Sequence, residues 1–138
     1  MLNSVPLVLG ENSSSDDTAL VNAVSEKWNF PVITHSEKDN EGFYLQVKNG
    51  VLGLADASDK KVLPVEVDFA SPASLYRKQH GGGRKEPIVK AIGLKGNEKW
   101  HVVDATPGLG RDAFVLVSVG CKVTMIERSP IVAALLED

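Results

Sequence analysis

The sequence has 138 residues, 43% hydrophobic and 24% charged, which is enough for one globular domain or one and a half small ones and excludes a wholly disordered chain. The net charge of -3 excludes a generally basic nucleic-acid binder, so any contact with nucleic acid must be local. The single cysteine and three histidines lack the spacing of a metal site, and no apolar run approaches the roughly 18 residues of a membrane span, so we expect a cytoplasmic protein that binds neither metal nor membrane.

Residues 1–70 have the pattern of a small α+β unit. A short apolar run over residues 5–9 precedes a polar stretch and then a helix that ends near Asn29. Either Ser15 or Asp16 is the expected N-cap of this helix. Five apolar side chains recur on one face at the helical period: Ala19, Leu20, Ala23, Val24 and Trp28.

Strand patterns follow in the same unit. Phe43–Val47 alternates apolar and polar residues, Asn49-Gly50 is typical of a hairpin turn, and Val51–Leu54 continues beyond it. The apolar residues of Val62–Phe69 predict one more strand.

Charge is unevenly distributed along the chain. Residues 1–70 carry a net charge of -6, residues 71–100 carry +5 and residues 101–138 carry -2. Residues 71–100 are called the basic segment below. Most of this segment, residues 71–98, is predicted to be a helical connector between the N-terminal unit and a C-terminal domain.

Two helices are predicted in the connector, separated by three glycines. The first spans Ser71–Gln79 with a proline in its first turn, and it ends at Gly81-Gly82-Gly83. The second spans Arg84–Ile92, with Pro87 in its first turn. Three consecutive glycines are costly in conformational entropy, so this loop needs a structural or functional reason.

Residues 99–138 give the clearest pattern. Their predicted elements are a strand over Trp100–Val103, a glycine-bearing turn, a helix over Arg111–Val119, a buried strand over Val123–Ile126 and a helix from Pro130. This order predicts two parallel strands joined by a right-handed crossover. Two parallel strands cannot bury both faces of a sheet, so we expect the chain to be part of a longer protein.

The turn after the first of these strands has the chemistry of a nucleotide site. Gly108 and Gly110 let the backbone approach a ligand, and the helix that follows presents free N–H groups to it. Asp104 ends the first strand and Glu127 ends the second, where a carboxylate can accept both hydroxyl hydrogens of a ribose.

Two cofactors fit this turn. Gly108, Gly110 and Ala113 match the loose dinucleotide fingerprint G-x-G-x-x-A, which would indicate an NAD(P)-dependent enzyme with a Rossmann fold. Pro107 argues against it, because a dinucleotide turn normally runs almost directly from its strand into the first glycine. The spacing Asp104-x-x-x-Gly108-x-Gly110 resembles instead the first motif of class I S-adenosylmethionine-dependent methyltransferases.

A closer resemblance covers about residues 68–138. The residues that carry it are Tyr76–Gly96, Val103–Leu116, Val119–Cys121 and Ile126–Leu136, and together they resemble the ribosomal RNA small subunit methyltransferase J family. The resemblance implies an α/β fold in which a small α+β unit precedes the first β-α-β part of a Rossmann-like class I methyltransferase core. It also implies methyl transfer from S-adenosylmethionine to the exocyclic N2 of one guanosine in bacterial 16S rRNA.

The same resemblance implies a set of cofactor-binding residues. These are Arg111 and Asp112 at the start of the helix and Glu127 and Arg128 after the second strand, and Asp104, Gly108 and Gly110 join them by position. The family's substrate motif lies beyond residue 138. We therefore assign no catalytic residue here and expect residues 1–138 alone to be inactive.

The basic segment is the candidate contact with 16S rRNA or the small ribosomal subunit. Its predicted RNA-binding residues are Arg77, Lys78, Arg84 and Lys85, which bracket the three glycines in an otherwise acidic chain. Two other interpretations of this loop are a hinge and a lid over the cofactor. For the chain as a whole, the alternative to an enzyme is a cofactor-binding or RNA-binding module without its own catalysis.

Overall fold

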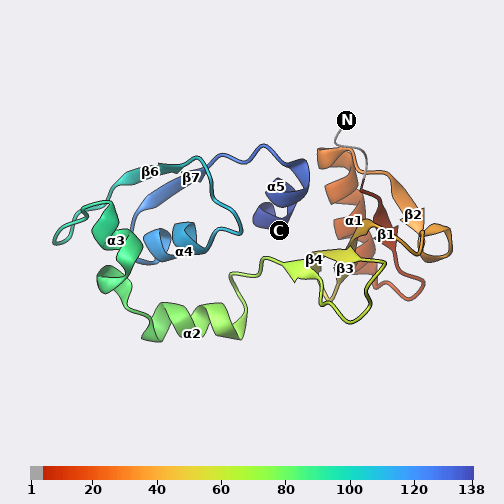
Figure 1. Cartoon of the computed structure of the whole chain (residues 1–138), viewed down its shortest axis with the longest axis horizontal. Coiled ribbons are helices and arrows are strands. Elements are labelled where there is room, and N and C mark those ends of the chain that lie inside the picture. The colour runs from red at the N-terminus through yellow and green to blue at the C-terminus, as the bar shows by residue number, and fades with distance from the viewer. Residues whose placement is uncertain (1–4) are drawn as a thin grey trace. The chain divides into compact units, whose positions relative to one another are not determined.

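The computed structural model describes residues 5–138 and divides the chain into two units (Figure 1). The first contains the chain up to Val67 together with Glu137–Asp138, and the second contains Asp68–Leu136. Each unit has its own sheet, and each is described by itself.

The first unit is built on a mixed sheet with the strand order β2-β1-β3-β4-β5. Its strands are β1 (Leu7–Leu9), β2 (Val32–Thr34), β3 (Phe43–Lys48), β4 (Val51–Asp56) and β5 (Val65–Glu66). Strand β1 is parallel to both β2 and β3, and the pairs β3–β4 and β4–β5 are antiparallel. The predicted hairpin is confirmed, with Asn49 at φ 54° and Gly50 at φ 75° between its strands.

Helix α1 (Ser15–Trp28) follows β1, as predicted. Its N-cap is Ser14, whose hydroxyl accepts a hydrogen bond from the Asp17 N–H at 3.0 Å. The prediction of Ser15 or Asp16 is therefore wrong, because the preceding serine supplies the same oxygen one residue earlier.

The inner face of α1 also differs from the prediction. Val21 and Val24 are its buried residues, whereas Ala19 and Ala23 are exposed. The helix ends at Asn29, whose left-handed φ of 57° is a common helix stop.

Two features of the first unit are not predicted from the sequence. Strand β2 has only three residues, and the 3-10 helix η1 (His35–Glu37) follows it directly. The strand predicted over Val62–Phe69 is present but much shorter than predicted, because only Val65–Glu66 pairs. Pro64 has no N–H to donate to a ladder, and Leu63 is 84% exposed.

The second unit begins with three short helices. They are α2 (Pro72–His80), the 3-10 helix η2 (Gly83–Lys85) and α3 (Pro87–Ala91). The single helix predicted over Arg84–Ile92 is wrong, because Glu86 is extended, with ψ 141°, between η2 and α3. The residue before a proline is disfavoured in the helical region, so Pro87 starts a new helix instead of continuing the old one.

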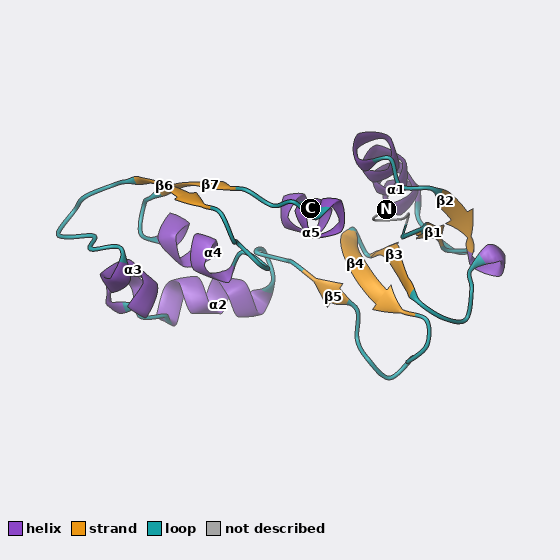
Figure 2. Ribbon diagram, turned by 45° about the horizontal axis from the view of Figure 1, so that its top comes forward, coloured by secondary structure: helices purple, strands orange, loops and turns teal. Residues whose placement is uncertain are grey.

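The β-α-β unit follows, as predicted. Its elements are β6 (His101–Asp104), α4 (Arg111–Ser118) and β7 (Lys122–Met125), and then α5 (Pro130–Glu137) begins. Strands β6 and β7 are parallel. Helix α4 lies against β7 and α3 against α4 (Figure 2). The core between them contains Val89, Leu116 and Cys121.

The sheet of the second unit is less buried than predicted. Val103 is 57% exposed, and Ile126, just after β7, is 56% exposed. Within the part of the chain that the structure describes, β6 and β7 pair only with each other. The expectation of a buried second strand is therefore wrong for these residues.

Candidate functional site

The glycine turn between β6 and α4 has a defined hydrogen-bond pattern. Asp104 Oδ1 accepts from the Thr106 N–H at 3.0 Å, and the Gly110 N–H donates to the Pro107 carbonyl at 2.8 Å. Gly108 and Gly110 both have positive φ, 53° and 71°. The turn therefore depends on conformations that other residues rarely adopt.

The two glycines of this turn differ in their surroundings. A Cβ on Gly110 would lie 2.7 Å from Phe69 Cζ and 3.0 Å from Leu136 Cδ2, so Gly110 is needed for close packing. A Cβ on Gly108 would meet no atom within 4 Å. Gly108 therefore leaves open space beside an exposed backbone, which is the arrangement that a bound ligand needs.

The start of α4 offers three backbone donors. Arg111, Asp112 and Ala113 are its first residues, and their N–H groups have no partner within the helix. The N-cap is Gly110, which has no side chain to satisfy them. These donors and the positive end of the helix dipole therefore remain available to a polar or anionic group.

Glu127 lies at the same edge of the sheet as the glycine turn. Strands β6 and β7 are parallel, Asp104 pairs with Met125, and the Ile126 N–H donates to the Asp104 carbonyl at 2.8 Å. The half-buried Glu127 is the next residue. Its Oε1 accepts from the Ser129 N–H at 2.8 Å, and its Oε2 has no hydrogen-bond partner among residues 5–138. One carboxylate oxygen is thus held in place while the other is available.

The remaining members of the predicted set are exposed. Arg111, Asp112 and Arg128 all present their side chains to solvent. The structure thus places the predicted cofactor residues at the carboxyl edge of β6 and β7, around the turn and the start of α4.

Arg111 also lines a cavity that sequence reasoning did not anticipate. The cavity has a volume of about 330 Å³, and it is lined by Phe69, Ala73, Ser74, Arg77, Arg111 and Phe114. Arg77 comes from α2 and Arg111 from α4, and neither forms an ion pair or a side-chain hydrogen bond with any residue that the structure describes. Two unpaired guanidinium groups at one cavity favour an anionic ligand.

The other predicted RNA-binding residues have different surroundings. Arg84 Nη2 donates to the carbonyls of Glu98 and Val119, each at 3.2 Å, and Val119 is the C-cap of α4. Arg84 therefore has a structural role at the end of that helix. Lys78 and Lys85 are exposed, and neither lines this cavity.

Residues 5–138 contain no cluster of three or more His, Cys, Asp or Glu side chains that could hold a metal ion. None of the helices described is long and apolar enough to span a bilayer.

Comparisons with known proteins agree with this geometry. A family model for SAM-dependent methyltransferases matches residues 23–138. A protein of Alteromonas mediterranea named ribosomal RNA small subunit methyltransferase J is 85% identical over 138 residues, which are 100% of this chain and 54% of that protein. A protein of the same name from Pseudoalteromonas atlantica is 58% identical over 97 residues, 70% of this chain and 38% of that protein.

A solved structure is also similar. It is a SAM-dependent methyltransferase from Neisseria gonorrhoeae, with 33% sequence identity and a TM-score of 0.61, and the match covers 95% of this chain and 50% of that one. This similarity confirms the predicted α/β class with a Rossmann-like methyltransferase core. The chain spans about half the length of the curated relatives it matches.

Proposed function

This chain belongs to the family of SAM-dependent methyltransferases, and from that premise we propose that the protein containing it methylates RNA of the small ribosomal subunit. The names of the two relatives described above support this substrate. The proposed acceptor is the exocyclic N2 of a guanosine in 16S rRNA. This acceptor is inferred from the resemblance of about residues 68–138 to the ribosomal RNA small subunit methyltransferase J family. We also propose that the protein acts in the cytoplasm.

The observation that carries the proposal is the shared edge of the glycine turn and Glu127. Asp104 and Glu127 each have one carboxylate oxygen engaged by a backbone N–H, so each is oriented. The second oxygen of Glu127 is available to a ribose hydroxyl, and Asp104 lies beside the turn where the methionine part of S-adenosylmethionine would bind. The open space at Gly108 fits such a ligand.

The start of α4 supplies the remaining contacts of the proposed cofactor site. The N–H groups of Arg111 and Asp112 would donate to the cofactor, and Arg128, beside Glu127, completes the set. The family match favours S-adenosylmethionine over the dinucleotide that Gly108, Gly110 and Ala113 also allow.

In the proposed reaction the cofactor supplies the methyl group and the protein positions the cofactor. S-adenosylmethionine, when bound, supplies an electrophilic methyl group that the substrate nitrogen can take up. The residues of this chain at the carboxyl edge of the sheet would bind and orient that cofactor, and open α/β folds bind their ligands at this edge. The group that receives the proton of the guanosine amine is not assigned to residues 5–138.

The cavity of Arg77 and Arg111 supports a contact with the RNA backbone. A guanidinium matches the geometry of a phosphate, and here two of them face one cavity without an acidic partner. Lys78 and Lys85 would add long-range attraction from the same basic segment. Arg84 is placed in the same set by its position in the sequence, although its guanidinium also binds Glu98 and Val119.

Methyl transfer tests the proposed function directly. The full-length gene product should transfer labelled methyl groups to small-subunit RNA or to immature small-subunit particles, and residues 1–138 alone should not. If the full-length product binds S-adenosylhomocysteine and RNA but transfers no label to small-subunit RNA or to the immature particles, it is a binding module without catalysis.

A further inference from the structure

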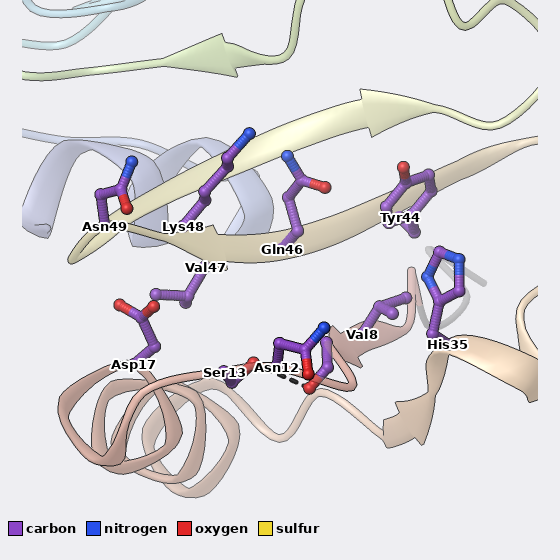
Figure 3. Close-up of a pocket in the computed structure, with 11 residues that line it drawn as sticks. Val8, Asn12, Ser13, Asp17, His35, Tyr44, Gln46, Val47, Lys48 and Asn49 are labelled. Carbon is purple, nitrogen blue, oxygen red and sulfur yellow. Dashed lines mark hydrogen bonds between the residues drawn. The ribbon is translucent and has the colours of Figure 1, made fainter.

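The sheet of the first unit has two faces of different character. The side chains of Leu45 and Val47 are buried on one face of β3. Tyr44, Gln46 and Lys48 alternate with them and lie on the opposite face. Figure 3 shows Val47 directed toward α1, whereas Gln46 and Lys48 point to the other side. The face with Tyr44, Gln46 and Lys48 is called the open face below.

Two cavities adjoin at the open face, and the first also extends around the end of β3 to Val47 and to Asp17 of α1. One has a volume of about 340 Å³ and the other about 420 Å³, and His35 and Tyr44 line both. The first also contains Asn12, Gln46 and Lys48. The second contains Lys38, Asn40, Asp56 and Lys60. The two cavities therefore share two ring side chains, with polar and basic groups on either side.

The first cavity lies at a switch point of the sheet. The chain leaves β1, passes through α1 and returns in β2 on one side of β1, whereas β3 lies on the other side. All three strands are parallel here, and the cavity is lined by residues after β1 and β2 and at the end of β3. Ligands of open α/β sheets bind at the carboxyl ends of strands at such points.

The polar groups of the first cavity are largely uncommitted. In the part of the chain that the structure describes, the side chains of Asn12, Gln46 and His35 form no hydrogen bond. Asp17, in contrast, accepts from the Gly50 N–H at 2.7 Å and so is occupied in fixing the hairpin to α1. The cavity therefore offers amide and imidazole groups that can both donate and accept.

The charge at the open face is opposite to that of its unit. Residues 1–70 carry a net charge of -6, yet these cavities are lined by three lysines, Lys38, Lys48 and Lys60, against two carboxylates, Asp17 and Asp56, and none of the three lysines forms an ion pair among the described residues. The carboxylate of Asp56 is engaged by the Ser58 N–H at 2.8 Å. Three unpaired lysines beside ring side chains favour a polyanion that also presents flat rings.

The ring of Tyr44 has one occupied face. Lys38 Nζ lies 4.5 Å from the ring centroid, and Lys38 lines only the second cavity. Tyr44 also lines the first cavity, together with Gln46.

We propose that the open face binds single-stranded RNA, with two successive nucleotides in the two adjoining cavities. Tyr44 stacks on a base, Gln46 hydrogen-bonds to the edge of that base, and Lys38, Lys48 and Lys60 contact the phosphates. The inference rests on the proposed function, in which the substrate is RNA, and adds a second RNA contact outside the second unit, which carries the proposed cofactor site.

The first test compares two aromatic residues on opposite faces of β3. The measurement is fluorescence anisotropy of a labelled single-stranded oligouridine titrated with the full-length gene product. Tyr44→Ala should weaken binding by about fivefold to a hundredfold, the range for losing one stacked base, and Tyr44→Phe should retain it. Phe43→Ala is the matched control, because Phe43 is 60% exposed on the other face, and it should bind like the parent. Equal affinities for the parent and Tyr44→Ala would overturn the proposal.

The second test separates phosphate contact from folding. Lys48→Ala should lower the slope of log affinity against log salt by about one-half to one unit, with an unchanged melting temperature. If Lys48→Ala instead loses binding to small-subunit ribosomal proteins while its RNA binding is unchanged, the open face is a protein-binding surface and the proposal is contradicted.

The outcome can be distinguished from failure of the proposed function. Binding of S-adenosylhomocysteine by every variant would show that the proposed cofactor site is intact, and methyl transfer by the parent tests the proposed function. If the parent transfers methyl groups but Tyr44→Ala and Lys48→Ala bind RNA as the parent does, the RNA site on the open face is rejected and the proposed function is not.

Discussion

The ring of Phe69 stacks on the ring of Phe114, with centroids 5.3 Å apart and planes within 7° of parallel. This contact fixes the segment before α2 on the first turns of α4. It also brings Phe69 against Gly110, where a Cβ would meet Phe69 Cζ at 2.7 Å. The conformation of the glycine turn is therefore linked to packing outside the β-α-β unit.

Gly110→Ala tests this link. The substitution adds a clash with Phe69 to the cost of a left-handed φ, so we expect it to destabilise the full-length protein by about 2–4 kcal/mol. Gly108→Ala is the control, because it has a similar φ and no atom within 4 Å, and it should cost about 1–2 kcal/mol. Urea unfolding measures both, and equal losses would show that the Phe69 contact contributes nothing.

Arg77→Ala tests the anion cavity. Removing one phosphate contact should reduce the salt dependence of RNA binding by about one unit of slope and leave S-adenosylhomocysteine affinity unchanged. Lys90→Ala removes a charge from the same unit outside this cavity and is the matched control. A loss of S-adenosylhomocysteine affinity in Arg77→Ala would instead assign the cavity to the cofactor.

Arg84 and Lys85 should differ although they are neighbours in the sequence. Arg84→Ala removes two hydrogen bonds to backbone carbonyls, one of them at the end of α4, and should lower stability by about 1–2 kcal/mol. Lys85→Ala should leave stability within about 0.5 kcal/mol of the parent, because Lys85 is exposed and forms no ion pair with any residue that the structure describes. Thermal unfolding of the two single variants distinguishes them, and a stable Arg84→Ala would refute the capping role.

The pKa of Glu37 should be lower than the ordinary value of a glutamate. Hydrogen bonds to its carboxylate from the backbone N–H and then the hydroxyl of Thr34 lower its pKa. Because the folded pKa is lower than the unfolded pKa, this contribution to stability is present above the unfolded pKa and is lost as the pH falls through the folded pKa. An NMR titration of the carboxyl carbon should show the low midpoint, and Thr34→Ala should raise it only in part, because the backbone donor remains. A midpoint at or above the usual glutamate value would contradict the contact.

Local signals predicted much of the fold. Asn49-Gly50 marks the hairpin, Pro72 starts α2, and the glycine turn joins β6 to α4, because each depends on the conformational preference of a few adjacent residues. Strand β2 has no such signal, since its three residues are held by pairing with β1. The break at Glu86 follows from Pro87, which the sequence interpretation placed within one helix.

The sequence predicted the part of the candidate site at the edge of β6 and β7, but not the cavity beside α2. Asp104 ends β6 and Glu127 follows the end of the parallel strand β7, so their spacing places them at one edge of the sheet. The cavity shared by Arg77 and Arg111 depends on how α2 packs beside α4, through Phe69 and Phe114, and such distant contacts leave no local pattern.

The most direct test of the cofactor site is the affinity of Glu127→Ala for S-adenosylhomocysteine. Calorimetric titration into the full-length parent and variant measures it, with Glu26→Ala as a control for losing an exposed carboxylate. If Glu127 binds the ribose, its removal should weaken binding by about tenfold to a hundredfold, as expected for the loss of charged hydrogen bonds. Equal affinities of the parent and Glu127→Ala would contradict the assignment of this edge as the cofactor site.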